Sequence, residues 1–158
     1  MVSITMDHSA MIIFRRHAGI DRLAQLEKEG NGKLRIFHAH NLGRDLASMS
    51  QTEQKIYDAL RIMVFSKAQQ ELSLTDHADL VLLVNHMKNK RDYFLTMDQA
   101  KYATLEGHRN IDVRFPDKKF LKEVEIRLGI VADAGKTAKK RVKIAKPHAK
   151  NQMKKGKK

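Results

Sequence analysis

The chain contains 158 residues, of which 42% are hydrophobic and 6% aromatic. This length suits one domain with a sizeable core and is too short for two full domains. The sequence has no cysteine, which excludes disulfide scaffolds, thiolate zinc sites, iron–sulfur clusters and cysteine nucleophiles. Any metal site must therefore use oxygen or imidazole ligands.

The formal net charge of +13 is unevenly distributed along the chain. Residues 133–158 carry a net charge of +10, whereas residues 1–132 carry only +3. The basic segment has few large apolar side chains, so it cannot offset the entropy lost on folding. We therefore expect a folded domain over residues 1–130 and a disordered tail over residues 131–158.

A polyanion, most economically RNA, is the partner expected for this tail, because counterion release drives the binding of Lys-rich segments to phosphate backbones. The tail contains no aromatic residue, so we expect contacts to phosphates rather than stacking on bases. The residues expected to make these contacts are Lys136, Lys139, Lys140, Arg141, Lys143 and Lys146.

Hydropathy gives no sign of a membrane protein. The longest apolar runs, such as residues 80–84, hold only a handful of residues, whereas a membrane-spanning helix needs about 20. The first residues lack the basic and long apolar regions of a secretory signal. We expect no transmembrane segment and a cytoplasmic location.

The first half of the chain alternates strand and helix patterns. Residues 2–6 form a short β-branched run that stops at an acid, which predicts a strand. Helical spacing then runs from residue 9 to residue 30, with one break predicted near Gly19. A second strand is expected over residues 34–37, and a short helix over residues 41–47.

The middle of the chain predicts two helices and a strand. Ser50 and Glu53 form a capping box that opens a helix ending near Ser66. Thr75 or Asp76 is expected to cap the next helix, which a run of basic residues closes after Met87. A third strand follows over residues 93–95.

The last part of the domain predicts one more strand between two helical segments. Residues 98–106 have helical composition and end at Gly107. Apolar residues alternate over 111–115, which predicts the fourth strand. Asp117 then caps an amphipathic helix that ends at Gly129. Strands separated by helices indicate an α/β fold with a parallel sheet covered on both faces, whose ligands bind at the carboxyl ends of the strands.

Acidic residues gather where this fold would place a ligand. Asp7 directly follows the first strand and Asp98 the third, while Asp45 comes soon after the second. Asp79 lies near the start of the helix that leads to the third strand, with Asp76 one turn earlier. Converging carboxylates repel unless a cation compensates them, and Mg²⁺ and Mn²⁺ prefer such oxygen ligands.

The spaced acids in MDHSAMI, LGRDL, TDHADLVLL and FLTMDQA, followed by VRFPDKKFLKEV, resemble the motifs of PIN-domain nucleases over about residues 2–128. The resemblance implies a three-layer α/β/α domain with a central parallel sheet of 4–5 strands. It also implies that Thr96 orients the carboxylates through its hydroxyl group. The catalytic residues implied are Asp7, Asp45, Asp79 and Asp98, with Asp7, Asp79 and Asp98 as metal ligands and Thr96 and Asp76 in support.

The activity implied by the resemblance is a Mg²⁺- or Mn²⁺-dependent hydrolysis of RNA phosphodiester bonds. Many small bacterial members of the family are toxins held by an antitoxin protein, while others process ribosomal or messenger RNA. A homodimer is expected from family analogy alone. Asp45 stands where the family usually has Glu, so the alternative is a noncatalytic RNA- or protein-binding module anchored to RNA by its tail.

Each acid also has a purely structural interpretation. Asp7 could cap the helix that follows it, and Asp98 could stabilise a helical first turn through the helix dipole. Asp76 fits a helix cap better than a metal site, which favours Asp79 as the ligand. His38 and His40 are two residues apart and would lie on the same face of a strand, which is the arrangement of a possible zinc site. Neither a His-Glu-x-x-His helix nor a Cys pair accompanies them, so the sequence does not favour a zinc site.

Overall fold

The computed structural model describes residues 1–13, 16–38, 48–66 and 71–131. Its centre is a four-stranded sheet in which every pair of neighbours is parallel, with the order β2-β1-β3-β4. The strands are β1 (Val2–Met6), β2 (Leu34–Phe37), β3 (Tyr93–Leu95) and β4 (Val113–Arg114). The prediction of an α/β fold with a parallel sheet is confirmed.

The strand order creates a switch point between β1 and β3. Strand β1 pairs with β2 on one side, with Val2 opposite Leu34, and with β3 on the other, with Ile4 opposite Tyr93. The chain therefore leaves β1 towards one edge of the sheet and later returns to its other side. In open α/β sheets, the crevice at the carboxyl ends of two such strands is the usual ligand site.

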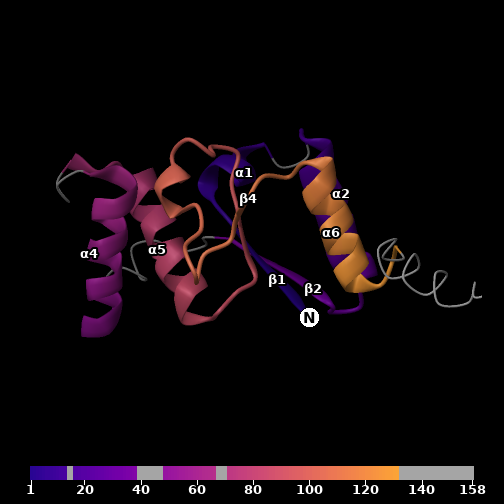
Figure 1. Ribbon diagram of the computed structural model, residues 1–158, viewed down its shortest axis with the longest axis horizontal. Coiled ribbons are helices and arrows are strands. Elements are labelled where there is room, and N and C mark those ends of the chain that lie inside the picture. Colours follow the sequence, from indigo (N-terminus) through magenta and orange to yellow (C-terminus); the bar gives the residue numbers. More distant parts are fainter. Residues whose placement is uncertain (14–15, 39–47, 67–70, 132–158) are drawn as a thin grey trace, which may run out of the picture.

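Helices cover both faces of this sheet (Figure 1). On one face, α2 (Ala18–Glu29) and α6 (Lys118–Leu128) bury their apolar sides against β1, β2 and β3. On the other lies α5 (Leu74–Lys88), with α4 (Gln51–Phe65) packed outside it. A short helix, α1 (His8–Ile12), follows β1 and contacts α5.

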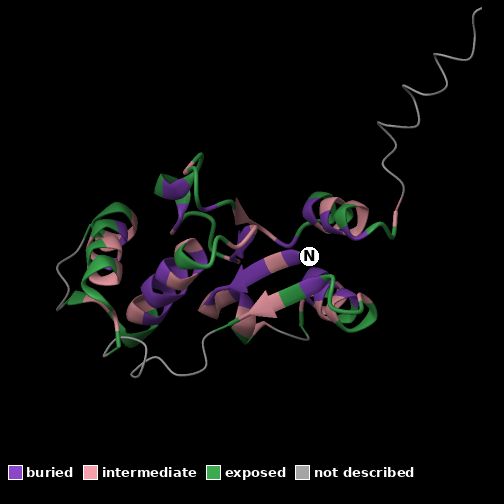
Figure 2. Cartoon of the chain, turned by 90° about the horizontal axis from the view of Figure 1, so that it is seen from below, coloured by how far each residue is buried: buried purple, intermediate pink, exposed green. Residues whose placement is uncertain are grey.

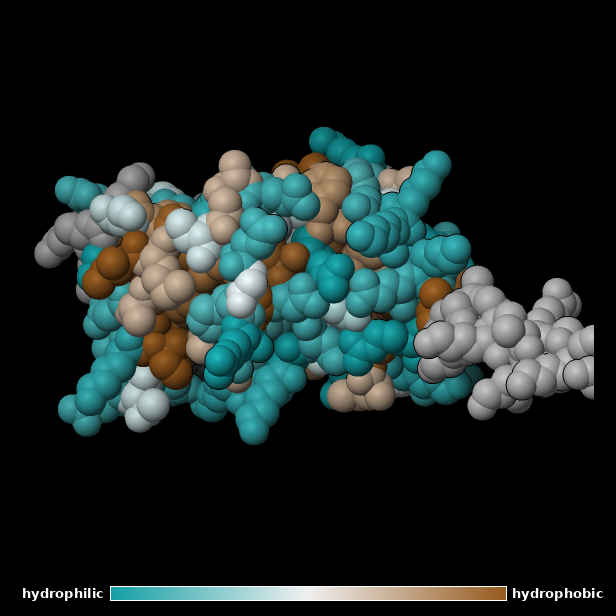
Figure 3. Space-filling model, in the orientation of Figure 1, coloured by the Kyte–Doolittle hydropathy of each residue, from teal (hydrophilic) through white to brown (hydrophobic). Residues whose placement is uncertain are grey.

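Helix α5 is buried around most of its circumference, as the colouring of Figure 2 shows. Its central residues 80–84 are all apolar and at most 5% exposed. A helix that is apolar on every side must be enclosed, because no face of it is suited to water. The outer helix α4 instead exposes Ile62 and Met63, and apolar surface gathers over this end of the molecule in Figure 3.

Several helix ends lie where the sequence predicts them. Ser50 and Glu53 form the expected capping box of α4, which ends at Ser66 in a left-handed conformation. Asp117 caps α6 by accepting a hydrogen bond from the backbone N–H of Phe120. Gly129 follows α6 with φ +77°, a conformation that glycine adopts without strain.

The predicted cap of α5 was wrong by two or three residues. Ser73, rather than Thr75 or Asp76, caps the helix, and its hydroxyl oxygen accepts from the backbone N–H of Asp76 at 3.1 Å. The Asp76 carboxylate in turn accepts from the backbone N–H of Ser73 at 3.1 Å. A reciprocal box satisfies two helix-end donors at once, whereas a single cap at Thr75 or Asp76 satisfies one.

Replacing Ser73 by Ala is expected to lower the free energy of unfolding by about 1 kcal/mol, the usual effect of losing such a cap. Thr75→Ala, in the exposed first turn of the same helix, should change it by no more than about 0.5 kcal/mol. Urea unfolding followed by far-ultraviolet circular dichroism measures both. Equal losses in the two variants would contradict the assignment of the cap.

The segment 98–106 is not the helix that its composition predicts. The structure has only a 3₁₀ turn there, Ala103–Leu105. Tyr102 and Leu105 are both buried in the core beneath α4 and α5. Residues three apart lie on the same side of a 3₁₀ turn, so this tighter turn points both side chains inwards. Burial of these two side chains therefore overrides local helix propensity.

Two other predictions differ in their boundaries. The break between the first two helices falls between Ile12 and Ala18, before Gly19. Gly19 is required for a different reason, because a β-carbon there would clash with the backbone carbonyl oxygen of Pro116. The fourth strand is also shorter than predicted, with only Val113 and Arg114 in the sheet.

Some predictions concern parts of the chain outside the described residues. The short helix over residues 41–47, with Asp45, is one of them, and the basic tail beyond residue 131 is the other. Among the described residues, none of the helices combines the length and the hydropathy that a bilayer-spanning segment needs.

Candidate active site at the carboxyl edge of the sheet

Asp7 lies at the centre of a hydrogen-bonded cluster at the switch point. Its side chain is buried, with 1% of the residue exposed. One carboxylate oxygen, Oδ1, accepts from the backbone N–H of Ala10 at 2.8 Å and thereby caps α1. The other oxygen, Oδ2, accepts from the hydroxyl of Thr96 at 2.7 Å, and the Ser9 hydroxyl donates to the same carboxylate. Asp7 thus has the structural role of a cap and also faces the end of β3.

The environment of Asp7 makes its ionisation costly. Burial raises the pKa of its carboxyl group above the ordinary value, and hydrogen bonds from Ala10, Thr96 and Ser9 offset this only in part. The negative charge of Asp79 raises the pKa of Asp7 further. Perturbed carboxylates of this kind concentrate at functional sites, because a purely structural role does not require a destabilised charge.

Thr96 and Ser9 hold the ends of β1 and β3 together. The Thr96 hydroxyl is fully buried, and besides donating to Asp7 it accepts from the backbone N–H of Asp98 at 2.9 Å. The Ser9 hydroxyl oxygen accepts from the backbone N–H of Met97 at 3.0 Å. The structure therefore places Thr96 against Asp7, as the motif predicts, and adds Ser9, which the sequence analysis did not single out.

Helix α5 brings a second buried carboxylate to the same place. Asp79 is 1% exposed, and its Oδ1 accepts from the backbone N–H of His8, the residue after Asp7, at 3.2 Å. Its other oxygen accepts from the ammonium group of Lys101 at 2.8 Å. The same ammonium donates to Oδ1 of Asp76 at 3.0 Å. Asp7 and Asp79 thus converge, with Asp76 beside them and Lys101 as their neighbouring cation.

Lys101 and Tyr102 belong to the site but do not stand out in the sequence. Burial opposes the charge of Lys101, yet its bonds to Asp79 and Asp76 outweigh this and raise its pKa. The Tyr102 hydroxyl is buried and has no hydrogen-bond partner among the described residues. Its pKa is raised by burial and then by the charges of Asp79 and Asp7, which places the phenol close to both carboxylates.

Asp98 lies at the rim of the site rather than inside it. Its side chain is exposed, and its carboxylate accepts from the backbone N–H of Lys101 at 3.1 Å, which stabilises the turn that carries Lys101. The structural interpretation of Asp98 as a first-turn acid therefore describes its position, although the turn is not an α-helix. No hydrogen bond joins Asp98 to the side chains of Asp7 or Asp79 within the described part of the chain.

The donor set suits a hard cation, although the described residues do not enclose one. No group of three His, Asp or Glu side chains in the described ranges is arranged to hold a metal ion. Mg²⁺, however, usually keeps several waters and takes only one or two carboxylates from the protein. Asp7 and Asp79 supply two such oxygen ligands, and the unpartnered hydroxyl of Tyr102 beside them has hydrogen-bonding capacity left over for a water.

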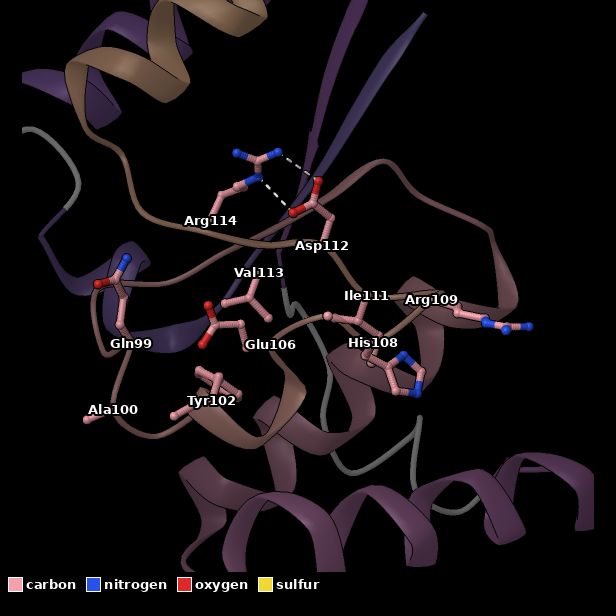
Figure 4. Close-up of a pocket in the computed structure, with 12 residues that line it drawn as sticks. Gln99, Ala100, Tyr102, Glu106, His108, Arg109, Ile111, Asp112, Val113 and Arg114 are labelled. Carbon is pink, nitrogen blue, oxygen red and sulfur yellow. Dashed lines mark hydrogen bonds and ion pairs between the residues drawn. The ribbon is translucent and has the colours of Figure 1, made fainter.

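A cavity of about 790 Å³ adjoins this site on the β4 side. Its wall is formed by residues of the 99–114 segment, and Tyr102 is the residue that it shares with the site. Figure 4 shows the pair of Arg114 and Asp112 on another part of the wall, joined at 2.7 Å. The cavity therefore meets the site at Tyr102, while Asp7, Asp76 and Asp79 do not line it.

Comparison with known proteins finds no match. No family model fits the chain, and no curated protein and no solved structure is detectably similar to it. The likeness to PIN-domain nucleases accordingly stays a prediction from the motifs, and the geometry of the Asp7–Asp79 pair is the basis for assigning a function.

Proposed function

We propose that this protein is a PIN-like ribonuclease that hydrolyses RNA phosphodiester bonds with Mg²⁺ or Mn²⁺ bound at Asp7 and Asp79. The observation that carries the proposal is the burial of two carboxylates side by side at the switch point of a parallel sheet. Such a pair costs stability unless cations compensate it, and the single ammonium of Lys101 offsets only one of the negative charges of Asp7, Asp76 and Asp79. The remaining buried charge is better explained by cation binding than by its contribution to the fold.

In this proposal, the residues around the carboxylates have separate roles. Asp7 and Asp79 would hold the ion, while Thr96 and Ser9 fix the orientation of Asp7 through their hydroxyl groups. Asp98 lies on the rim, and Asp45, which is outside the described residues, would complete the acidic set as the resemblance implies. A bound divalent ion would supply an activated water and neutralise the charge that develops on the phosphate. The basic tail would increase the residence time of RNA by contacting its phosphates.

The direct test is cleavage of a mixed RNA substrate by the purified full-length protein. We expect cleavage with Mn²⁺, none in EDTA, and a loss of at least about 100-fold in Asp79→Asn, since even residues that only support a metal ligand contribute about 10- to 100-fold. Asp58→Asn, which changes a half-exposed carboxylate on α4, is the matched control and should keep full activity. Cleavage that survives in Asp79→Asn would refute the proposed site.

The alternative function, a noncatalytic RNA- or protein-binding module, is favoured by one contact. The ammonium of Lys101 already forms ion pairs with Asp79 and Asp76 without any metal. RNA binding without cleavage, together with no stabilisation of the fold by Mn²⁺, would support this alternative, because an ion that binds only the native state must raise the unfolding temperature.

A further inference from the structure

We propose that Lys101 is a built-in competitor of the divalent ion, so that the ion binds the acidic pair only after the lysine ammonium leaves Asp79. This inference rests on the proposed function, because it concerns the same two carboxylates. It assigns to the chain a device that sets the affinity of the site for metal. No local sequence pattern predicts it, since the lysine reaches the acids only through the fold.

The geometry places the ammonium where it competes for the same oxygen. Nζ of Lys101 lies 2.8 Å from Oδ2 of Asp79, whose side chain is only 2% exposed. A carboxylate oxygen that accepts a charge-assisted hydrogen bond at this distance directs one of its lone pairs at the ammonium. A metal ion bound to that oxygen would bring two positive charges close together in a buried place. Occupation by the ion and by the ammonium should therefore be mutually exclusive.

Tyr102 adds a second polar group with unused hydrogen-bonding capacity to the same place. The side chain is buried, with 1% of the residue exposed, and its hydroxyl makes no hydrogen bond of standard geometry within the described residues. Burial raises the pKa of the phenol first, and the charges of Asp79 and Asp7 and weak hydrogen bonding to them raise it further, so the hydroxyl faces both carboxylates. Buried hydroxyl groups are almost always paired, with protein or with ordered water. The phenol can therefore donate to a carboxylate or to an ion-bound water once Lys101 has left Asp79.

Alternative partners are within reach of the Lys101 ammonium when it leaves Asp79. The ammonium also donates to Asp76 at 3.0 Å, and the side chains of Lys101 and Asp76 are each 19% exposed, so solvent reaches this ion pair. The ring of Phe65 lies 4.8 Å from Nζ and offers a favourable surface for a cation. The Lys101 ammonium therefore does not become a buried charge without a partner when it leaves Asp79. The exchange of ammonium for metal is possible without unfolding the site.

The test is a titration of the full-length protein with Mn²⁺, in which free Mn²⁺ is followed by electron paramagnetic resonance. An opposite charge within about 4–6 Å changes the proton affinity of a carboxylate by one to three pKa units. We therefore expect Lys101→Met and Lys101→Gln to bind Mn²⁺ at least about tenfold more tightly than the wild type. Two neutral replacements are used so that the test can still be made if one of them does not fold. Circular dichroism shows whether each variant is folded.

Two controls separate charge from packing. Lys101→Arg keeps the positive charge and should show no gain in affinity. Lys88→Met removes a lysine from the distant ion pair with Glu53 and should also bind Mn²⁺ like the wild type. A gain in Lys101→Arg equal to that in the neutral variants would overturn the proposal, because the positive charge would then not be the competitor.

The outcomes also distinguish this inference from the proposed function. Binding of Mn²⁺ by the wild type with no gain in the neutral variants rejects the role of Lys101 and leaves the ribonuclease proposal standing. Binding by none of the variants rejects both, since no metal site would then exist at Asp7 and Asp79. Tighter binding in every neutral variant that folds, with no gain in Lys101→Arg, supports the competition.

Discussion

Asp7→Asn is expected to make the protein more stable and at the same time to abolish the proposed RNA cleavage. The substitution removes a buried negative charge, whose pKa is raised by burial and by Asp79, and keeps an oxygen that accepts from the backbone N–H of Ala10. Asn is as good a helix cap as Asp. We expect a gain of about 1 kcal/mol in the free energy of unfolding, which is usual for a substitution that removes a destabilising feature of a functional site. Cleavage should fall by at least about 100-fold.

Urea unfolding at several pH values tests the stability of this variant. The gain should be largest at neutral pH and shrink as the pH falls, because Asp7 of the wild type then becomes protonated and no longer carries a buried charge. Asp7→Ala is the matched comparison, since it removes the charge and the cap together and should be less stable than Asp7→Asn. A destabilised Asp7→Asn protein would show that the carboxylate serves the fold.

A second large effect is expected from acid, through a histidine about two turns along α5 from Asp79. His86 on α5 is fully buried, its Nδ1 lies 3.0 Å from the Thr5 hydroxyl, and its Nε2 has no partner among the described residues. Burial, and then the positive charge of Arg91, lower the pKa of His86 from 6.5 to about 4. The folded protein therefore resists protonation that the unfolded chain accepts.

The sign of the pH effect follows from this difference. Between pH 6.5 and about 4 the unfolded chain binds a proton at His86 that the folded protein does not, so stability falls as the pH falls. The full loss amounts to about 3 kcal/mol. Protonation of Asp7 in acid has the opposite effect and stabilises the folded protein, because its pKa is raised. The contribution of His86 must therefore be measured by comparing the wild type with a His86 variant. Urea unfolding of wild type and His86→Asn across this range provides this comparison.

His86→Asn should show a flatter dependence of stability on pH than the wild type, whatever its stability at neutral pH. His108→Asn, which changes a half-buried histidine on a surface loop, should keep the wild-type dependence. If wild type and His86→Asn lose the same free energy on acidification, the buried histidine is not the cause.

The parts of the fold that the sequence predicts well are those governed by local rules. The strand over residues 2–6, the box of Ser50 and Glu53 and the end of α6 at Gly129 each depend on a few adjacent residues. Parallel strands separated by helices also fix which edge collects the acids. Asp7 and Asp79 could therefore be placed near each other before any coordinates were known.

The parts that escape prediction are decided by distant contacts. Local composition favours a helix over residues 98–106, but burial of Tyr102 and Leu105 pulls this segment into a turn. That turn is what directs Lys101 towards Asp76 and Asp79, across 22 or more positions in the sequence. Asp98, which the motif places among the ligands, is carried to the rim for the same reason. No spacing rule contains this information.

The enclosure of α5 also determines the order in which the molecule can open. Its central turns are covered by α4 on one side and by the sheet on the other, whereas α4 has one face in water. Local fluctuations of low free energy belong to elements with few buried contacts, and amides in enclosed elements exchange with solvent only when the whole domain unfolds. Asp79 is therefore carried by a unit that stays closed while α4 frays. The acidic pair keeps its geometry through motions that loosen the outer layer.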